Sequence, residues 1–231
     1  WVGSVIEAPA TSGGSPYGYF GGGRPSPGSI TSTVDRIDYS NDTETLAVKG
    51  PLSQQRYEIN ATGNLSYGYF AGPQSPTRSE FDRIDYGNDT ATALVKGTLS
   101  VQRWGLGATG NLSYGYFAAG SPGPKSTIDR IDYSNDGTTA SPKGPLDRNA
   151  WGVTGGGNLS YGYFAGGSPG YTSFVSRVDY GNDTATASPK GNLYQSWYSG
   201  GHSGNASYGY WAGGKDPSGD TSKVSRIDYS N

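Results

Sequence analysis

The chain has no cysteine and no methionine, and His202 is its only histidine. Without cysteine it can form no disulfide bonds and no thiolate metal sites. A single histidine cannot provide the ligand clusters that usually bind zinc, copper or iron in proteins. We therefore expect neither a metal nor a cofactor. Because methionine is missing, the sequence does not begin at a start codon, and we expect it to be a module of a longer protein.

An excess of charge of one sign and long apolar runs are missing too. The 231 residues include 17 Lys and Arg against 19 Asp and Glu, so the net charge is −2. This balance leaves no basic stripe of the kind that binds phosphate backbones, and we expect no nucleic-acid partner. No apolar run approaches the roughly 20 residues that span a bilayer, so we expect no membrane insertion.

Recognisable catalytic patterns are also absent. His202 lies in a Gly-rich turn, residues 200–204, without a nucleophile-elbow motif, which argues against a Ser-His-Asp triad. Nearly all aspartates belong to a repeated pattern, and no separate pair of carboxylates for glycoside hydrolysis stands out. We therefore predict that the chain is not an enzyme.

Aliphatic residues are scarce, whereas turn-forming and aromatic residues are abundant. The 39 Gly and 14 Pro would by themselves indicate disorder. The 19 Tyr and 5 Trp argue against it, because they offer large surfaces that can be buried at regular positions. We expect a folded protein with an aromatic core.

The most informative pattern is an internal repeat. The string Ser-Tyr-Gly-Tyr-Phe, or a close variant, occurs five times, and four of its first tyrosines follow one another at a constant interval of 47 residues: Tyr67, Tyr114, Tyr161 and Tyr208. A period of this size indicates an array of one supersecondary unit, whose copies must pack on each other to bury their apolar faces.

Each unit is predicted to contain four short strands. A Gly- and Ala-rich segment is followed by the Tyr-rich strand, by an Arg-Ile-Asp-Tyr strand such as 128–133, by an Asn-Asp-Thr hairpin turn, and by a Thr/Ala strand such as 90–95 or 184–188. Such units, without helical periodicity, are typical of propeller blades. We predict an all-β fold, a five-bladed β-propeller in a single domain 1–231. Its four-stranded blades would cover about 1–50, 51–97, 98–144, 145–191 and 192–231.

The unit resembles the kelch repeat over the whole chain. The motifs that carry the resemblance are a strand ending in Gly166-Gly167, the Arg-Ile-Asp-Tyr strand, the Asn-Asp-Thr turn and the Leu-Ser-x-x-Arg segments at 52–56 and 99–103. The usual outer-strand Trp is replaced by small residues, and Pro73 breaks the double glycine in the second copy. The near-identical copies also look like repeats in structural proteins of marine phages, which implies a virion or other extracellular surface.

The two ends of the chain affect how the blades are completed. Asn231 falls where the outer strand of blade five should begin, so blade five is expected to lack that strand and to expose an edge open to self-association. At the other end, a gapped alignment places Trp1 at the position of Trp104. An ungapped alignment places Glu7 there, and we favour it.

Arg and Asp alternate in the third strand of every unit, as in Arg130 and Asp132. A feature present in all five copies is best explained by packing. We interpret these residues as an ion pair or an Arg-to-carbonyl anchor that fixes one blade to the next, rather than as a ring of functional charges.

Candidate binding residues are those that vary between copies. In the propeller that the kelch resemblance implies, the b–c and d–a loops share one face, and an aromatic residue begins the strand after each d–a loop: Tyr57, Trp104, Trp151 and Trp197. These aromatics pack in the core or form a stacking platform. The variable b–c loops above them contain Arg24, Gln74, Arg78, Lys125, Tyr171 and Lys215. We expect a scaffold or binding module with a protein or glycan ligand, or alternatively a lectin.

Overall fold

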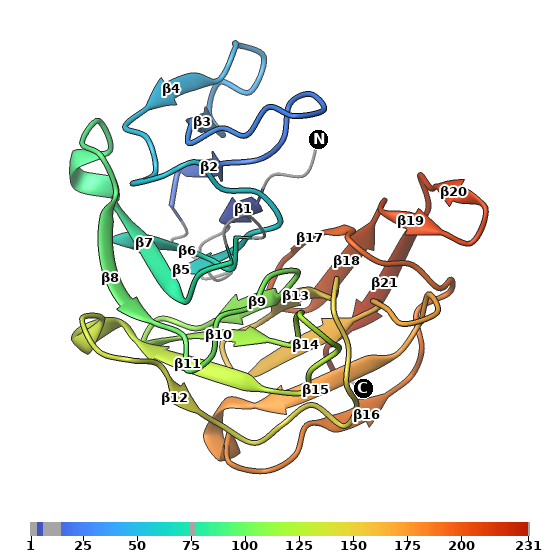
Figure 1. Ribbon diagram of the computed structural model, residues 1–231. Coiled ribbons are helices and arrows are strands. Elements are labelled where there is room, and N and C mark those ends of the chain that lie inside the picture. The colour runs from blue at the N-terminus through green and yellow to red at the C-terminus, as the bar shows by residue number, and fades with distance from the viewer. Residues whose placement is uncertain (1–3, 7–14, 74–76, 231) are drawn as a thin grey trace.

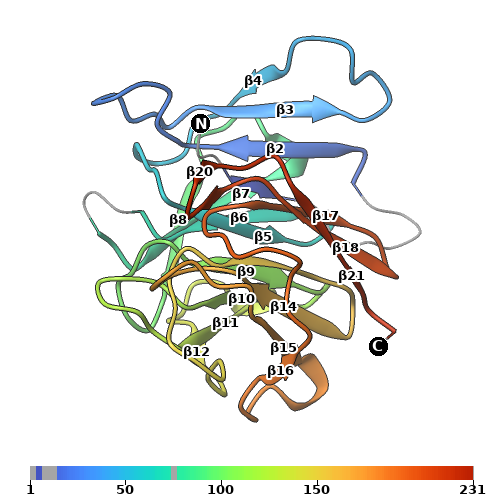
Figure 2. The ribbon, with the colours of Figure 1, turned by 90° about the vertical axis from the view of Figure 1, so that its right-hand side faces the viewer.

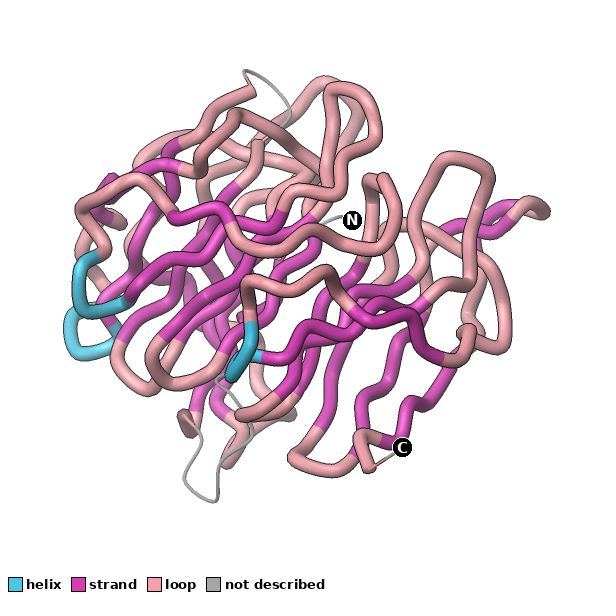
Figure 3. The backbone as a smooth tube through the Cα atoms, turned by 90° about the horizontal axis from the view of Figure 1, so that it is seen from below, coloured by secondary structure: helices cyan, strands magenta, loops and turns pink. Residues whose placement is uncertain are grey.

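Five small antiparallel sheets stand in a ring around a central axis (Figure 1). The computed structural model describes residues 4–6, 15–73 and 77–230. Within these residues there is no α-helix; three short 3-10 turns, η1 (Tyr86–Asn88), η2 (Tyr133–Asn135) and η3 (Tyr180–Asn182), lie at the outer edge of the ring (Figures 1 and 3). The all-β, five-bladed β-propeller predicted from the repeat is confirmed.

Each blade runs outward from the axis in chain order. Blade one contains β1 (Ser4–Ile6), β2 (Tyr17–Gly21), β3 (Val34–Asp38) and β4 (Ala47–Lys49). Blade two contains β5 (Asn60–Gly63), β6 (Tyr67–Ala71), β7 (Glu80–Asp85) and β8 (Leu94–Thr98). Blade three contains β9 (Gly107–Gly110), β10 (Tyr114–Ala118), β11 (Ile128–Asp132) and β12 (Ser141–Pro142). Blade four contains β13 (Thr154–Gly157), β14 (Tyr161–Ala165), β15 (Val175–Asp179) and β16 (Ser188–Lys190).

Blade five is the exception, with three strands in its sheet within the described residues. These strands are β17 (Gly201–Gly204), β18 (Tyr208–Ala212) and β21 (Val224–Asp228), and β21 is the edge. The expectation that blade five lacks its outer strand is therefore confirmed. Its b–c loop adds a small hairpin of its own, β19 (Lys215–Asp216) and β20 (Gly219–Asp220).

The outer strands begin later than the sequence suggested. The strand expected at 90–95 is β8 (Leu94–Thr98), and the one expected at 184–188 is β16 (Ser188–Lys190). The turn before each is longer than a tight hairpin, because Asp85 and Asp179 accept a hydrogen bond from the backbone two residues on and start a 3-10 turn there.

The first strand also corrects an alignment. In β1, Val5 pairs with Phe20, as Ala108 pairs with Phe117 in blade three. Val5 and Ala108 each stand four residues after a tryptophan, so this register agrees with the gapped alignment and not with the ungapped one that we favoured. Trp1 and Glu7 themselves lie outside the described residues.

The hydrophobic core lies between the blades. Four clusters of buried residues each join two neighbouring blades, from one and two to four and five. Successive side chains of a strand point to opposite faces, so within β10 Tyr116 packs toward blade four and Phe117 toward blade two. Both are fully buried, and aromatic rings thus form the core that the aliphatic-poor composition predicted.

The innermost strands approach one another very closely. β1, β5, β9, β13 and β17 lie side by side in that order around the axis. A Cβ atom added at Gly155 would lie 2.3 Å from the carbonyl oxygen of Ala108 in the neighbouring blade. Glycine in this strand is therefore required by close backbone approach, as the sequence suggested.

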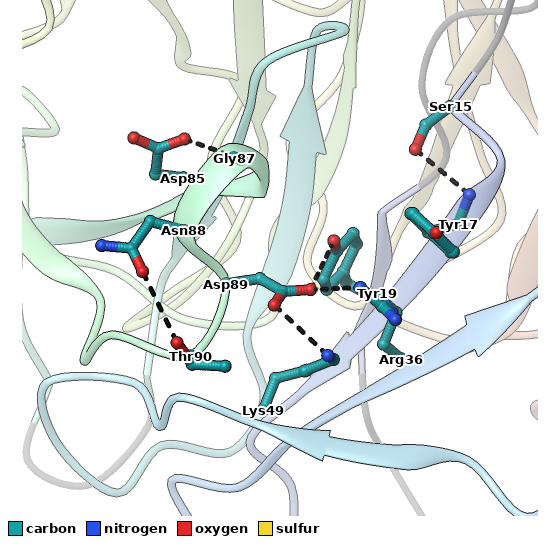
Figure 4. Close-up of polar contacts among 10 residues, drawn as sticks. All are labelled: Ser15, Tyr17, Tyr19, Arg36, Lys49, Asp85, Gly87, Asn88, Asp89 and Thr90. Atoms are coloured by element: carbon teal, nitrogen blue, oxygen red, sulfur yellow. Dashed lines mark hydrogen bonds and ion pairs between the residues drawn. The ribbon is translucent and has the colours of Figure 1, made fainter.

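A polar junction also fixes each of the first three blades to the next, and Figure 4 shows the one between blades one and two. Asp89, in the turn of blade two, accepts hydrogen bonds from Tyr19 (3.0 Å) and Arg36 (2.7 Å) of blade one, and Lys49 Nζ lies 3.3 Å from its other oxygen. Burial raises the pKa of Tyr19, so its hydroxyl remains a donor at neutral pH. The predicted blade-to-blade anchor is confirmed for Arg36, and its equivalents Arg83 and Arg130 form the same kind of ion pair. Its acidic partner is the turn aspartate of the next blade, whereas Asp38 accepts hydrogen bonds from Ser40 in its own turn.

The same junction recurs with nearly constant dimensions. Tyr69 and Arg83 bind Asp136 at 3.0 and 2.7 Å, and the equivalent pair in blade three, Tyr116 and Arg130, binds Asp183 at 2.9 and 2.8 Å. A tyrosine of each following blade stacks on the hydroxyl-bearing ring, at centroid distances of 4.7 to 4.8 Å. The stacked pairs are Tyr19–Tyr86, Tyr69–Tyr133, Tyr116–Tyr180 and Tyr163–Tyr229.

Candidate functional site

The b–c and d–a loops form one face of the ring, called the loop face below. Short backbone pairings join the two kinds of loop within a blade: Trp104 with Ser121, Trp151 with Ser168, and Tyr198 with Lys215. In Figure 2 this face lies to the left, where the β2–β3 loop and the β19–β20 hairpin project.

Backbone hydrogen bonds link the blades across the mouth of the ring. Gly105 N donates to Glu58 O (3.2 Å), Gly152 N to Gly105 O (2.7 Å), and Ser199 N to Gly152 O (2.8 Å). All four residues have positive φ, between 55° and 65°. Each directly follows an aromatic residue, so this chain of bonds brings Tyr57, Trp104, Trp151 and Tyr198 side by side around the mouth.

The aromatic rings form a continuous row. Ring centroids lie 5.5 Å apart between Trp104 and Trp151, 5.3 Å between Trp151 and Tyr198, and 5.3 Å between Tyr198 and Tyr171. All four side chains are partly exposed. Tyr171, in the b–c loop of blade four, adopts φ of 51°, a backbone conformation that is uncommon for a bulky residue. We call Trp104, Trp151, Tyr171 and Tyr198 the aromatic row.

Trp197, a predicted site residue, is not part of this row. It is 1% exposed and belongs to the core between blades four and five. Tyr198 follows Trp151 by one full period and makes the backbone pairing expected of the site position, so blade five was aligned one residue out of register. Trp197 instead stands where blades two and three carry the buried Arg56 and Arg103.

The predicted loop residues are spread over the loop face. The guanidinium of Arg24 lies 5.5 Å from the centre of the Tyr57 ring. Lys125 pairs through its backbone with Ala150, at the start of the next blade. Arg78 is partly buried and Lys215 is exposed. Gln74 lies outside the described residues.

Glu58 is a site residue that the sequence reasoning missed. Burial raises the pKa of its carboxyl, and the charge of Lys215 partly opposes this effect. Glu58 occupies the position of Gly105 and Gly152, at φ of 55°. The signal was available, because an acidic residue there breaks the glycine pattern of the neighbouring blades.

His202 is structural. Its Nε2 lies 3.2 Å from the hydroxyl of Tyr229, and its ring packs against Trp211. Burial lowers the pKa of His202 to about 4, so it is neutral at pH 7. Among the described residues no three His, Asp or Glu side chains gather to hold a metal ion. In that same part of the chain, no helix is both long enough and apolar enough to cross a membrane.

Comparison with models of known protein families and with curated proteins gives no match. The site is therefore defined by its geometry: a row of aromatic rings, one partly buried acid and several cationic side chains on the loop face.

Replacing Glu58 by glycine is expected to stabilise the protein at pH 7. The substitution removes a non-glycine residue from the left-handed region, worth about 1–2 kcal/mol, and it also removes a carboxyl that burial disfavours in its charged form. Thermal melts of Glu58→Gly and Glu58→Gln separate the two effects. A melting temperature of Glu58→Gly at or below that of the unmodified chain would contradict the assignment of strain to this residue.

Proposed function

We propose that the chain is a non-enzymatic binding module, a kelch-type propeller that holds a protein or glycan partner on its loop face. The aromatic row carries this proposal. Four partly exposed rings in contact with one another, on a rigid frame of inner strands, offer a surface on which sugar rings or peptide side chains stack. A blade-to-blade frame holds these rings in place before a ligand arrives, which lowers the entropy cost of binding.

The charges near the row fit a binding surface. Glu58 is a single acidic group at the mouth, and the positive charge of Lys215 partly offsets the effect of burial on the pKa of its carboxyl. A glycosidase would instead use a pair of carboxylates set about 5–10 Å apart. The likeness of the repeats to those of phage structural proteins favours a surface protein of viral or bacterial origin.

A lectin is the second candidate. The observation that favours it is the extent of the aromatic row, which spans blades three to five and offers several equivalent stacking positions. Weak sites repeated in this way add up to useful avidity on a dense glycan surface.

Binding to a glycan array and to a displayed peptide library distinguishes the two candidates. We expect Trp151→Ala to weaken whichever interaction is found by about tenfold or more, because it removes the ring at the centre of the row. Leu159→Ala, an exposed residue in the turn between β13 and β14, is the matched control and should bind unchanged. Sugar binding that survives both Trp104→Ala and Trp151→Ala would contradict the lectin hypothesis. Peptide binding that survives both substitutions would contradict the proposal that the partner binds at the loop face.

A further inference from the structure

Blade five exposes a face that is buried in every other blade. Tyr210 is 40% exposed and Val224 is 58% exposed. Their equivalents are at most 1% exposed: Tyr19, Tyr69, Tyr116 and Tyr163 for the tyrosine, and Val34, Phe81, Ile128 and Val175 for the valine. Arg226, which corresponds to the junction arginines, is exposed as well. Blade five therefore presents the hydroxyl and guanidinium side of a junction to solvent.

Blade one exposes the opposite half of the same junction. Asp42 is the turn aspartate of blade one, and it is exposed, whereas Asp89, Asp136 and Asp183 are 7 to 8% exposed. The stacking tyrosine of this blade, Tyr39, is 50% exposed. No hydrophobic cluster of the described residues joins blades five and one, and an open sector separates their ribbons in Figure 1.

The constancy of the three complete junctions, from blades one and two to blades three and four, helps to explain this open sector. Their Tyr–Asp and Arg–Asp distances differ by only 0.1 Å between copies, so these blades meet through the same contacts and at a similar rotation. If each blade were rotated by one fifth of a circle relative to the previous one, Tyr210 would meet Asp42 as Tyr116 meets Asp183. Tyr210 and Asp42 are both exposed instead, so the rotation per blade is smaller and five blades leave part of the circle unfilled.

We propose that the open sector is a docking site for one further blade of the same repeat sequence. Such a blade is complementary to both sides of the open sector. Its turn aspartate would bind Tyr210 and Arg226 of blade five, and its own Tyr-Arg pair would bind Asp42 of blade one. A second copy of the whole chain fits less well, because each of its five blades already has at least one face packed against a neighbouring blade of its own. This inference concerns assembly and does not depend on the proposed function of the loop face.

A buried hydroxyl shows what an incomplete junction looks like in this ring. Tyr163, in blade four, is 1% exposed, and its hydroxyl has no hydrogen-bond partner among the residues that the structure describes. In the three earlier junctions this hydroxyl binds the turn aspartate of the following blade. The described residues of blade five offer no aspartate there, so within these residues the junction between blades four and five is incomplete as well.

The test is a variant in which a copy of residues 136–190 follows Asn231. We expect its melting temperature to exceed that of the unmodified chain by about 5 °C or more, since the added blade forms a core and a polar junction with blade five and again with blade one. In this variant Tyr210→Ala and Asp42→Asn should each lower the melting temperature, whereas in the unmodified chain both should change it by less than about 1 °C. Tyr116→Ala, which removes a junction present in both proteins, is the control that destabilises both.

Three results would overturn the proposal. An extended variant with an unchanged melting temperature that is insensitive to Tyr210→Ala would show that the added repeat does not dock. Destabilisation of the unmodified chain by both Tyr210→Ala and Asp42→Asn, in a sample that sediments as a monomer, would show that blade five docks on blade one. Oligomers of the unmodified chain that dissociate on Asp42→Asn would show that a second copy occupies the sector.

Discussion

Gly144→Ala is expected to destabilise the protein by about 3 kcal/mol, near the upper end of the range for overpacking. A Cβ atom at this position would lie 1.9 Å from the carbonyl oxygen of Ala185 in the next blade. The obstacle is backbone, so no side-chain rotation can relieve it. The shift would also break the hydrogen bond from Gly144 N to Asp183 O, 2.9 Å long, and would pull that aspartate away from Tyr116 and Arg130.

Gly191 provides the matched control within the same chain. It is the equivalent glycine one period later, at the end of blade four, and a Cβ atom there meets no atom within 4 Å. Gly191→Ala should therefore leave the free energy of unfolding within about 0.5 kcal/mol of the unmodified value. Urea unfolding of both variants measures the difference. Equal losses at the two positions would show that glycine is required by the strand end itself and not by contact with the next blade.

Much of the architecture could be predicted from the sequence because the repeat encodes one unit five times. The five copies predicted the number of blades, and the alternation of Tyr116 and Phe117 is what lets one strand contribute to two cores. Because the chain is poor in aliphatic residues, its many aromatic rings can be buried only where one copy of the repeat packs against the next. The missing outer strand of blade five was predicted on the same basis.

The errors arose where local pattern and tertiary contact disagree. Arg36 has Asp38 two residues away, yet it binds Asp89, which is far along the chain and belongs to the next blade. Sequence spacing cannot show such a pair, because it depends on how blades are turned against one another. Trp197 was chosen as a site residue for its aromatic ring, although the interval of 47 residues from Trp151 indicates Tyr198.

The positions of the candidate site residues could be predicted only in part. Tyr57, Trp104, Trp151 and Tyr171 lie on the loop face, as expected from the propeller topology. Glu58 was missed because its position is special only in three dimensions. The chain of backbone bonds through Gly105 and Gly152 requires a positive φ there, and an acidic residue in that conformation marks a place where stability has been given up.

Arg103→Ala is expected to cost about 3–5 kcal/mol, because it leaves the fully buried carboxylate of Asp129 without its cation. The guanidinium lies 2.8 Å from that carboxylate and also donates to the carbonyl oxygens of Ala119 and Phe117, so it ties the segment that precedes strand β9 to strands β10 and β11. Asp129→Ser alone should lower the free energy of unfolding by a similar amount, since it leaves the buried guanidinium of Arg103 without its carboxylate.

Another blade of the chain replaces both members of this ion pair by small residues. In blade four the positions of Arg103 and Asp129 are taken by Ala150 and Ser176, and both are buried. We therefore expect Asp129→Ser to raise the stability of Arg103→Ala while lowering that of the unmodified protein, with a coupling energy of about 2 kcal/mol in a double-mutant cycle. Denaturant unfolding of the four proteins measures this coupling. If the two losses simply add, the carboxylate is hydrated in the absence of Arg103, and the pair is a surface contact rather than the buried ion pair that joins three segments of blade three.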